Sequence, residues 1–352
     1  MKALSPPTPS KPRIEYVDML RGFAMLWVVC QHLEIYFGDP EGNYRMPILF
    51  FISGAFFKLR PTKEFVIRKI NMNIVPLVFF WFISWLLMTF YAEFVAVGFD
   101  LTKVVWADVF DFFGKYSVYQ VDDRIMWFII TLFLINMFFY PLLKYFPHKY
   151  VFLLSLVLFM GGGLVERLLD YPTTGILATP VEFLFFQLFF ITGVVFGKIL
   201  IQWINENKHI YVVLSCCLVI FVSFLFIHWE YGYLQKIPKR VHDYLSLMSF
   251  LIIALWIFSK LQAYHLAKIC RFIGSNSLVV YAMHMLVYLY FYKSLVEPLV
   301  LSYIDVAQYA LAYKWFVFLF LVISCTGFIY LFNKYLPAVI GKKDFFKIKS
   351  SS

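Results

Sequence analysis

The feature that most constrains this chain is a series of long apolar stretches that recur from one end to the other. Ten of them approach the roughly 20 residues that an α-helix needs to cross a bilayer. They cover approximately 17–37, 46–57, 73–92, 125–143, 150–165, 183–201, 210–227, 245–261, 273–292 and 315–332. Solid apolar blocks predict helices, because a transmembrane barrel strand alternates polar and apolar residues over about ten positions.

The overall composition agrees with this interpretation. Of the 352 residues, 62% are hydrophobic and 15% are charged, whereas soluble domains spend about 25% of their residues on charged side chains. The chain is therefore neither a disordered protein nor an ordinary soluble enzyme. In a membrane protein the net charge of +10 matters for orientation, and we expect no nucleic-acid partner. We predict an all-α, polytopic integral membrane protein with about ten transmembrane helices in a lipid bilayer and no separate soluble domain.

The positions of the basic residues predict the orientation. If the chain starts inside and crosses ten times, the inner segments hold 20 Lys and Arg and the outer segments hold 10. The second stretch is short enough to be re-entrant, but without a crossing there the basic turn 58–69 would lie outside, against the positive-inside tendency. We therefore predict a multi-pass protein of the cell inner or plasma membrane with both termini cytoplasmic. Residues 1–13 and the basic segment 336–352 would be cytoplasmic tails around a membrane domain at 14–335.

Two ionisable residues within the first stretch are the strongest functional signal. A charge near the bilayer centre is costly and marks a site by default. Arg21 and His32 are 11 positions apart, so at about 100° per residue they share one helix face, separated by about 16.5 Å along its axis. Asp18 lies near the same face and can pair with Arg21. The alternatives are an arginine that snorkels to the inner headgroups and a histidine that bonds to a neighbouring helix.

Other segments carry weaker signals. The five cysteines lack the paired spacings of zinc sites, so we expect packing residues and no metal. Trp229, Tyr231 and Tyr233 precede three cations in 236–240, a mixture typical of an interfacial belt or of a sugar-binding surface. The connection 93–124 combines aromatic and acidic residues, which favours a short helix at the outer interface.

The residues around Arg21 resemble a known family. The segment YVDMLRGFA at 16–24, followed by His32, is similar to the opening of the acyltransferase 3 family of integral-membrane O-acyltransferases that act on carbohydrates. Further resemblances are FFISG at 50–54, WF at 127–128, and GSNS at 274–277 leading to Tyr281 and His284. The resemblance covers most of the chain.

This resemblance implies an acyl transfer. An acyl group, most often acetyl, would move from cytoplasmic acetyl-CoA or another acyl-CoA to a hydroxyl of a cell-surface or lipid-linked carbohydrate. His32 would be the general base, because imidazole titrates near neutral pH; a covalent acyl-histidine is the alternative. Arg21, Arg68 and Lys69 would bind the donor's phosphates. Many members carry two arginines three positions apart before the third span, and here Met72 stands where the second is expected.

Four further residues would support the site, each with a structural alternative. His284 would orient the substrate or His32, or would bond to another helix. Ser53 would belong to the site, or would allow close helix packing together with Gly54. Trp127 would form a wall of the site or an interface anchor, and Tyr281 accompanies His284 in its motif.

Two other classes of protein compete with an enzyme. A transporter or polysaccharide exporter without acyl-transfer chemistry would line its path with Arg21 and His32, and broken helices in two matching halves would favour it. A structural scaffold explains the composition but gives the cation and the imidazole within the first stretch no purpose.

Overall fold

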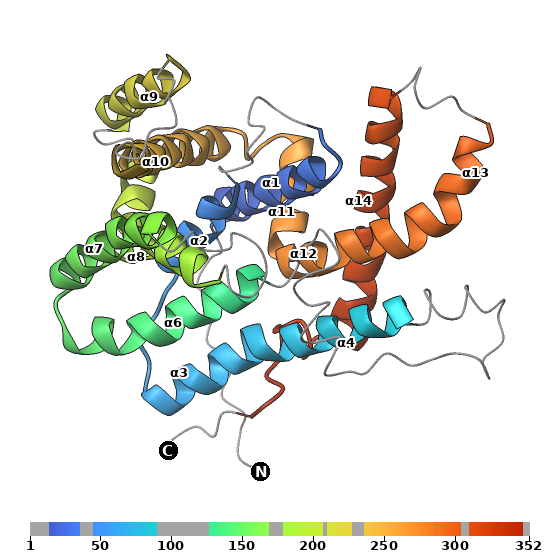
Figure 1. Ribbon diagram of the computed structural model, residues 1–352, viewed down its shortest axis with the longest axis horizontal. Helices are drawn as coiled ribbons and strands as arrows, with labels where there is room; N and C mark the ends of the chain where they lie inside the picture. The colour runs from blue at the N-terminus through green and yellow to red at the C-terminus, as the bar shows by residue number, and fades with distance from the viewer. Residues whose placement is uncertain are drawn as a thin grey trace, which may run out of the picture.

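The computed structural model describes residues 14–35, 45–89, 127–168, 179–206, 210–226, 236–303 and 310–347, and the regular elements in these ranges are all helices (Figure 1). The tail 1–13, the helix expected within 93–124 and the aromatic residues Trp229, Tyr231 and Tyr233 lie outside the described residues. The predicted all-α class is confirmed for the described ranges.

The helices follow one another in chain order with short connections where these are described. They are α1 (Glu15–His32), α2 (Arg45–Ala55), α3 (Thr62–Lys69), the π-helical η1 (Ile70–Ile74), α4 (Val75–Thr89), α6 (Trp127–Tyr145), α7 (His148–Leu168), α8 (Thr179–Glu206), α9 (Ile210–Phe226), α10 (Lys236–Lys260), α11 (His265–Ser275), α12 (Ser277–Leu286), the π-helical η6 (Val287–Val296), α13 (Glu297–Leu301) and α14 (Ala310–Tyr335).

Several of these helices are long and apolar enough to cross a membrane. Six qualify among the described residues: Thr62–Leu87, Trp127–Tyr145, His148–Val165, Pro180–Glu206, Arg240–Lys260 and Ala310–Tyr335. The bent pair α11 and α12 would add a seventh, while α2 and α9 are shorter apolar helices. α1 is not among the six, since its 18 residues include Glu15, Asp18 and Arg21. The multi-pass character is thus supported, and the number of about ten spans stays a prediction.

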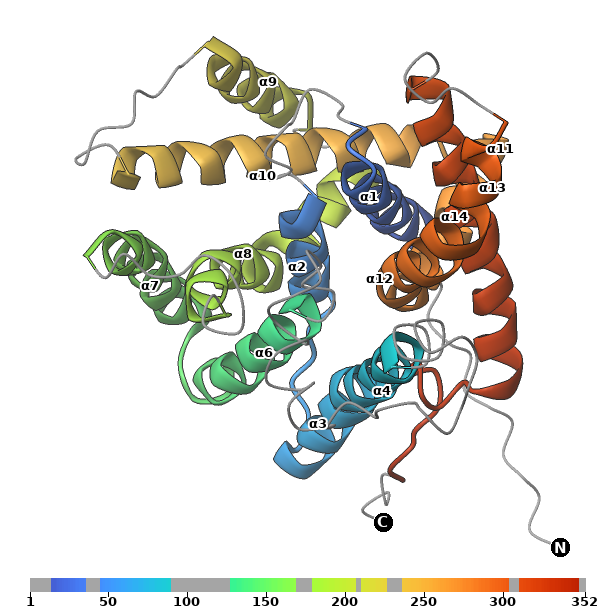
Figure 2. The same ribbon diagram turned by 45° about the vertical axis from the view of Figure 1, so that its right-hand side comes forward.

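The first two helices lie at the centre of the molecule. In Figure 2, α1 and α2 are surrounded by α6, α8, α10 and α12, and α1 packs most extensively on α11, as α2 does on α8. Glycine permits this close approach, because a Cβ on Gly22 would lie 1.8 Å from the Cys270 carbonyl oxygen, and one on Gly54 would lie 1.9 Å from that of Phe190. The helix that carries Arg21 and His32 is therefore enclosed by protein.

A sharp break separates α11 from α12. The two helices are bent by 82°, although the apolar stretch 273–292 predicts one continuous helix. Asn276 occupies the break, donating from Nδ2 to the Phe272 carbonyl at 2.8 Å and accepting at Oδ1 from Asn333 Nδ2 at 2.9 Å. The asparagine amide therefore satisfies a carbonyl at the end of α11 and also links this break to α14 through Asn333. Among the described residues this is the one pair of helices bent in this way.

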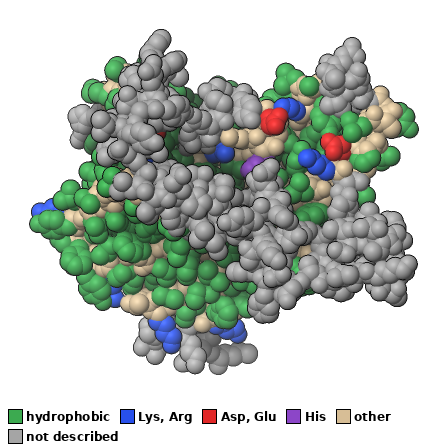
Figure 3. All heavy atoms as spheres, in the orientation of Figure 1, with side chains coloured by type: hydrophobic (Ala, Val, Ile, Leu, Met, Phe, Trp, Pro, Cys, Tyr) green, Lys and Arg blue, Asp and Glu red, His purple; other side chains and the backbone are tan. Residues whose placement is uncertain are grey.

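Segments predicted to share a membrane side lie together. At one end, Tyr140 Oη donates to the Arg60 carbonyl at 2.8 Å and Lys144 Nζ bonds to Thr62 Oγ1 at 3.0 Å. At the other end, Lys314 Nζ lies 3.0 Å from Glu34 Oε2. Hydrophobic side chains cover most of the described surface between such polar groups in Figure 3. This separation is consistent with the predicted alternation of inner and outer segments.

Candidate functional site

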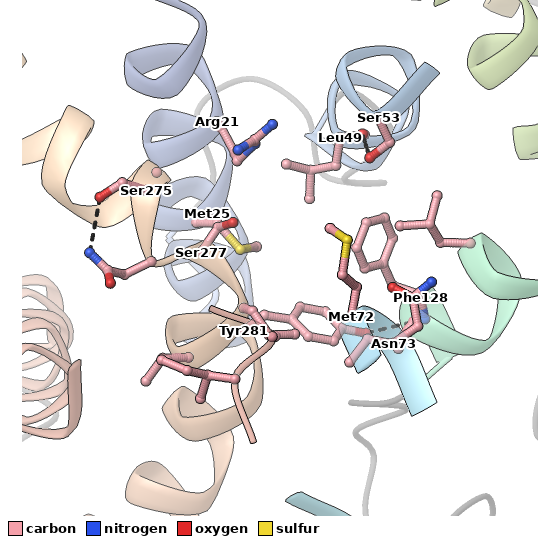
Figure 4. Close-up of a pocket in the computed structure, with 18 of the residues that line it drawn as sticks. Arg21, Met25, Leu49, Ser53, Met72, Asn73, Phe128, Ser275, Ser277 and Tyr281 are labelled. Carbon is pink, nitrogen blue, oxygen red and sulfur yellow. Dashed lines mark hydrogen bonds between the residues drawn. The ribbon is translucent and has the colours of Figure 1, made fainter. Parts of the chain in front are cut away.

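A cavity of about 580 Å³ lies where α1, α2, η1, α6 and the α11/α12 break meet (Figure 4). Its volume falls within the range of about 300–1,000 Å³ typical of small-molecule sites. The described lining residues are Arg21, Met25, Leu49, Ser53, Met72, Asn73, Phe128, Ile129, Leu132, Gly274, Ser275, Asn276, Ser277, Leu278, Val279, Tyr281, Ile340, Gly341 and Lys342. The sequence-predicted residues Arg21, Ser53 and Tyr281 are thus brought together.

Arg21 supplies positive charge to this cavity. In Figure 4 its side chain extends from α1 toward the side where α2 presents Leu49 and Ser53. Arg21 Nη1 lies 3.3 Å from Asp18 Oδ1, with the two side chains 26% and 7% exposed. The predicted pair between Asp18 and Arg21 therefore forms, and it holds the guanidinium in the cavity. Ser53 Oγ donates to the Leu49 carbonyl at 2.8 Å within α2.

Phe128, Ile129 and Leu132 form the wall that α6 contributes. The Tyr281 hydroxyl accepts a hydrogen bond from the Phe128 backbone nitrogen at 3.2 Å, and the two rings are 5.5 Å apart. Trp127 is half-buried, with its ring 5.2 Å from Phe186 and 6.4 Å from Phe50. Trp127 thus packs behind the cavity wall, whereas its neighbour Phe128 lines it.

The two predicted site histidines, His32 and His284, lie next to each other at the C-terminal end of α1. His32 is the last residue of α1 and its side chain is exposed, while His284 in α12 is buried. Their ring centroids lie 5.2 Å apart. His284 Nδ1 is 2.9 Å from the Val280 carbonyl, and its Nε2 is buried and has no hydrogen-bond partner among the described residues. The helix–helix hydrogen bond considered for His284 is therefore not the contact that these atoms make.

The helix α12 contributes one residue near Arg21 and another near His32. Tyr281 lines the cavity beside Arg21, and His284, three residues further along α12, contacts His32. His32 is not among the lining residues of the cavity. Arg21 and His32 on α1 are therefore each accompanied by a residue of α12, Tyr281 at the cavity and His284 at the other end.

The remaining predicted cations lie apart from this cavity. Arg68 and Lys69 line a second pocket of about 190 Å³ with Phe57 and Phe65, and Met72 borders both pockets. Lys69 Nζ sits 5.6 Å from the Phe65 ring centroid. The three cations assigned to one donor site are therefore divided between two adjoining pockets.

Three polar residues of the large cavity, Asn73, Asn276 and Lys342, are not among the predicted site residues. Asn73 and Asn276 are buried amides within or between helices; Asn73 opens the apolar stretch 73–92, and Asn276 belongs to the GSNS segment at 274–277. Lys342 belongs to the basic segment after α14, whose composition alone predicts a solvated tail. Arg240, part of the presumed surface cluster, is instead buried and donates to the Phe159 carbonyl at 3.0 Å. Among the described residues, no group of three or more metal-ligating side chains is found.

The fold and the cavity define a multi-pass helical membrane protein with a charged chamber among its helices and a pair of neighbouring histidines, one exposed and one buried. A family model described as an acyltransferase domain, that of the acyltransferase 3 family, matches residues 14–334. The chain belongs to this family and is an acyltransferase, as the resemblance around Arg21 indicates. No curated protein and no solved structure matches the chain.

Proposed function

We propose that the protein transfers an acyl group, most often acetyl, from cytoplasmic acyl-CoA to a hydroxyl of a cell-surface or lipid-linked carbohydrate. The observation that carries this proposal is the shared face of α1. Arg21 enters a 580 Å³ cavity at one end, and His32 meets His284 at the other. The axial separation of about 16.5 Å between Arg21 and His32 suits an extended donor whose phosphates and thioester need different surroundings.

The donor would bind with its phosphates at the cationic end. Arg21 is the charged residue of α1 in the cavity, and guanidinium binds phosphate oxygens in a bidentate manner. The neutral groups of Ser53, Asn73 and Ser277 add hydrogen-bonding capacity along the wall. Arg68 and Lys69 would contribute from the adjoining pocket, which Met72 separates from the main one.

His32 would act as the general base. Its imidazole would take the proton from the acceptor hydroxyl as that oxygen attacks the thioester carbonyl. The carbon–sulfur bond then breaks, an ester forms, and the proton passes to the departing thiolate to give free CoA. No external oxidant or reductant is needed. An acyl-histidine intermediate would divide the same reaction into two steps.

His284 is suited to orient His32. A carbonyl can only accept, so the 2.9 Å contact with Val280 places a proton on Nδ1 of His284 and leaves a lone pair on Nε2. That nitrogen can accept an N–H of the neighbouring imidazole, which would fix the His32 tautomer with its other nitrogen ready for the hydroxyl proton. His284 would thus be a positioning residue, and the proton transfer itself would belong to His32.

In this assignment the donor enters from the cytoplasm. The basic segments around Arg60 and Lys144 would lie on the cytoplasmic side, in accordance with the positive-inside tendency, and His32 would lie toward the outer side. Both termini would be cytoplasmic, and the membrane would be the cell inner or plasma membrane. The acceptor would then approach from the side opposite the donor.

The test compares cell-surface glycans from cells that express the wild type or His32→Ala. We expect mass spectrometry to show one acyl mass per modified unit with the wild type and its loss with His32→Ala, at equal membrane levels. Exposed His148 provides the control, since His148→Ala should keep the modification. Near-normal acylation by His32→Ala would remove this histidine from the chemistry.

A further inference from the structure

We propose that Lys342, in the segment after the last helix, binds a phosphate of the acyl donor beside Arg21. The proposal rests on the function proposed above and adds a donor-binding residue to it. Lys342, Gly341 and Ile340 line the large cavity, yet they lie beyond residues 14–334, which match the acyltransferase family. This segment therefore completes the chamber from outside the matched range.

The segment is held against η1 by specific contacts. Asn71 is 1% exposed and makes two hydrogen bonds to Phe346: its Nδ2 donates to the Phe346 carbonyl and its Oδ1 accepts from the Phe346 nitrogen, both at 2.9 Å. Ile340 is buried. A buried amide that pairs with one backbone position on both sides fixes the chain there, so the lysine is presented to the cavity by a built structure.

Glycine allows the chain to turn close to η1. Gly341 has φ of +70°, and a Cβ there would lie 3.2 Å from the Met72 Cα. The left-handed backbone and the short approach both favour glycine at this position. The turn brings Gly341 against Met72, which stands where the resemblance leads us to expect a second cation. Lys342 follows directly in the chain, so the segment after α14 supplies a cation to this part of the cavity wall.

The charges of the cavity favour a role in anion binding. Arg21 and Lys342 are the charged residues among its described lining. Arg21 is paired with Asp18 at 3.3 Å, which offsets part of its positive charge. Lys342 Nζ donates to Asn276 Oδ1 at 2.5 Å; because an amide oxygen is neutral, this bond positions the ammonium without cancelling its charge. A polyanion in the cavity therefore gains from the second cation.

The other basic residues of the region are placed differently. Lys69 packs over the rings of Phe57 and Phe65 in the smaller pocket. Lys343 and Lys347 belong to the same segment and, like Lys342, are exposed, but they do not line the cavity. Lys343 thus offers a matched control, since it has the same charge, is adjacent in the chain and lies outside the site.

The experiment measures CoA binding to the purified full-length protein in detergent by calorimetry. We expect Lys342→Gln to weaken CoA binding by about tenfold, the scale of one charge-assisted hydrogen bond, while Lys343→Gln binds as the wild type does and Lys342→Arg retains most of the affinity. Asn71→Leu, which releases the segment, should weaken binding similarly.

A second measurement separates a phosphate contact from a structural effect. With S-acetyl-pantetheine, a donor without the nucleotide phosphates, Lys342→Gln and the wild type should have equal kcat/KM, whereas with acetyl-CoA the variant should show a raised KM and an unchanged kcat. Equal CoA affinity of Lys342→Gln and the wild type, or an equal loss with both donors, overturns the role of Lys342. Failure of the wild type itself to bind CoA would instead contradict the proposed function.

Discussion

A very close approach of two helices lies one residue from Arg21 and leads to a quantitative prediction. A methyl group at Gly22 would sit 1.8 Å from the Cys270 carbonyl oxygen, 2.7 Å from its carbonyl carbon and 2.8 Å from the Gly274 nitrogen. All three are backbone atoms of α11 and the helix end, so no side-chain rotation relieves the clash. Gly22→Ala therefore forces α1 and α11 apart.

The required movement can be worked from the same geometry. An ordinary contact begins at 3.4 Å, so the Cβ at 1.8 Å falls short by about 1.6 Å. Overpacking typically costs about 1–3 kcal/mol, occasionally more, and we expect the upper part of this range because both partners are backbone. A misplacement of about 1 Å can lower catalysis about 100-fold, and Gly274 and Arg21 both line the cavity. Donor-dependent kcat/KM should fall by at least that factor.

The assay combines thermal unfolding in detergent with acyl-transfer kinetics. Gly327 in α14 and Gly161 in α7 are matched controls, because a Cβ on either meets nothing within 4 Å. Gly327→Ala should leave activity unchanged and should stabilise its helix by up to about 1 kcal/mol. If Gly22→Ala unfolds at the same temperature as these controls and retains full activity, the close approach of α1 and α11 is wrong, and with it the placement of Arg21 in the cavity.

Three further predictions concern the rest of the bundle. Arg240→Ala should lower the free energy of unfolding by about 1.5–3 kcal/mol, since it removes the donor to the Phe159 carbonyl; a melting temperature equal to that of the wild type would contradict this. Lys314→Ala should cost less than about 1 kcal/mol, because its pair with Glu34 is solvent-exposed, and a larger loss that persists in high salt would refute the surface assignment. Reporter fusions after Lys58 and after Lys115, which lies outside the described residues, should report cytoplasm and exterior respectively; the reverse result overturns the orientation.

The helix that carries the site could be predicted because its signal is local. Arg21 and His32 lie on one helix, so the helical repeat alone relates them in space, and the expense of a charge in lipid indicates a site. The Asp18–Arg21 pair followed from the same reasoning and is present at 3.3 Å. Neither deduction needed knowledge of how the helices pack.

Other parts of the site depend on contacts between distant segments. The bond from Lys342 to Asn276 joins residues 66 positions apart, and that from Asn71 to Phe346 joins residues 275 positions apart. No periodicity in the sequence encodes such pairings. The break at Asn276 lies in the polar segment GSNS at 274–277, but the sequence does not show that the bend is stabilised by Asn333, which lies in a different helix.

The position of α1 explains how a helix with three charged residues remains within this bundle. Lipid would penalise Glu15, Asp18 and Arg21, but α1 is covered by α2, α10, α11 and α12, and its charges find partners in the protein: Asp18 pairs with Arg21, and Glu15 pairs with Arg271 of α11. Such a cover requires the helices to approach closely, which the facing glycines Gly22 and Gly274 permit. Gly22 and Gly274 take no part in the chemistry, but they let α11 pack closely on α1. This packing excludes lipid from α1, and only where lipid is excluded can the helix retain the charge of Arg21.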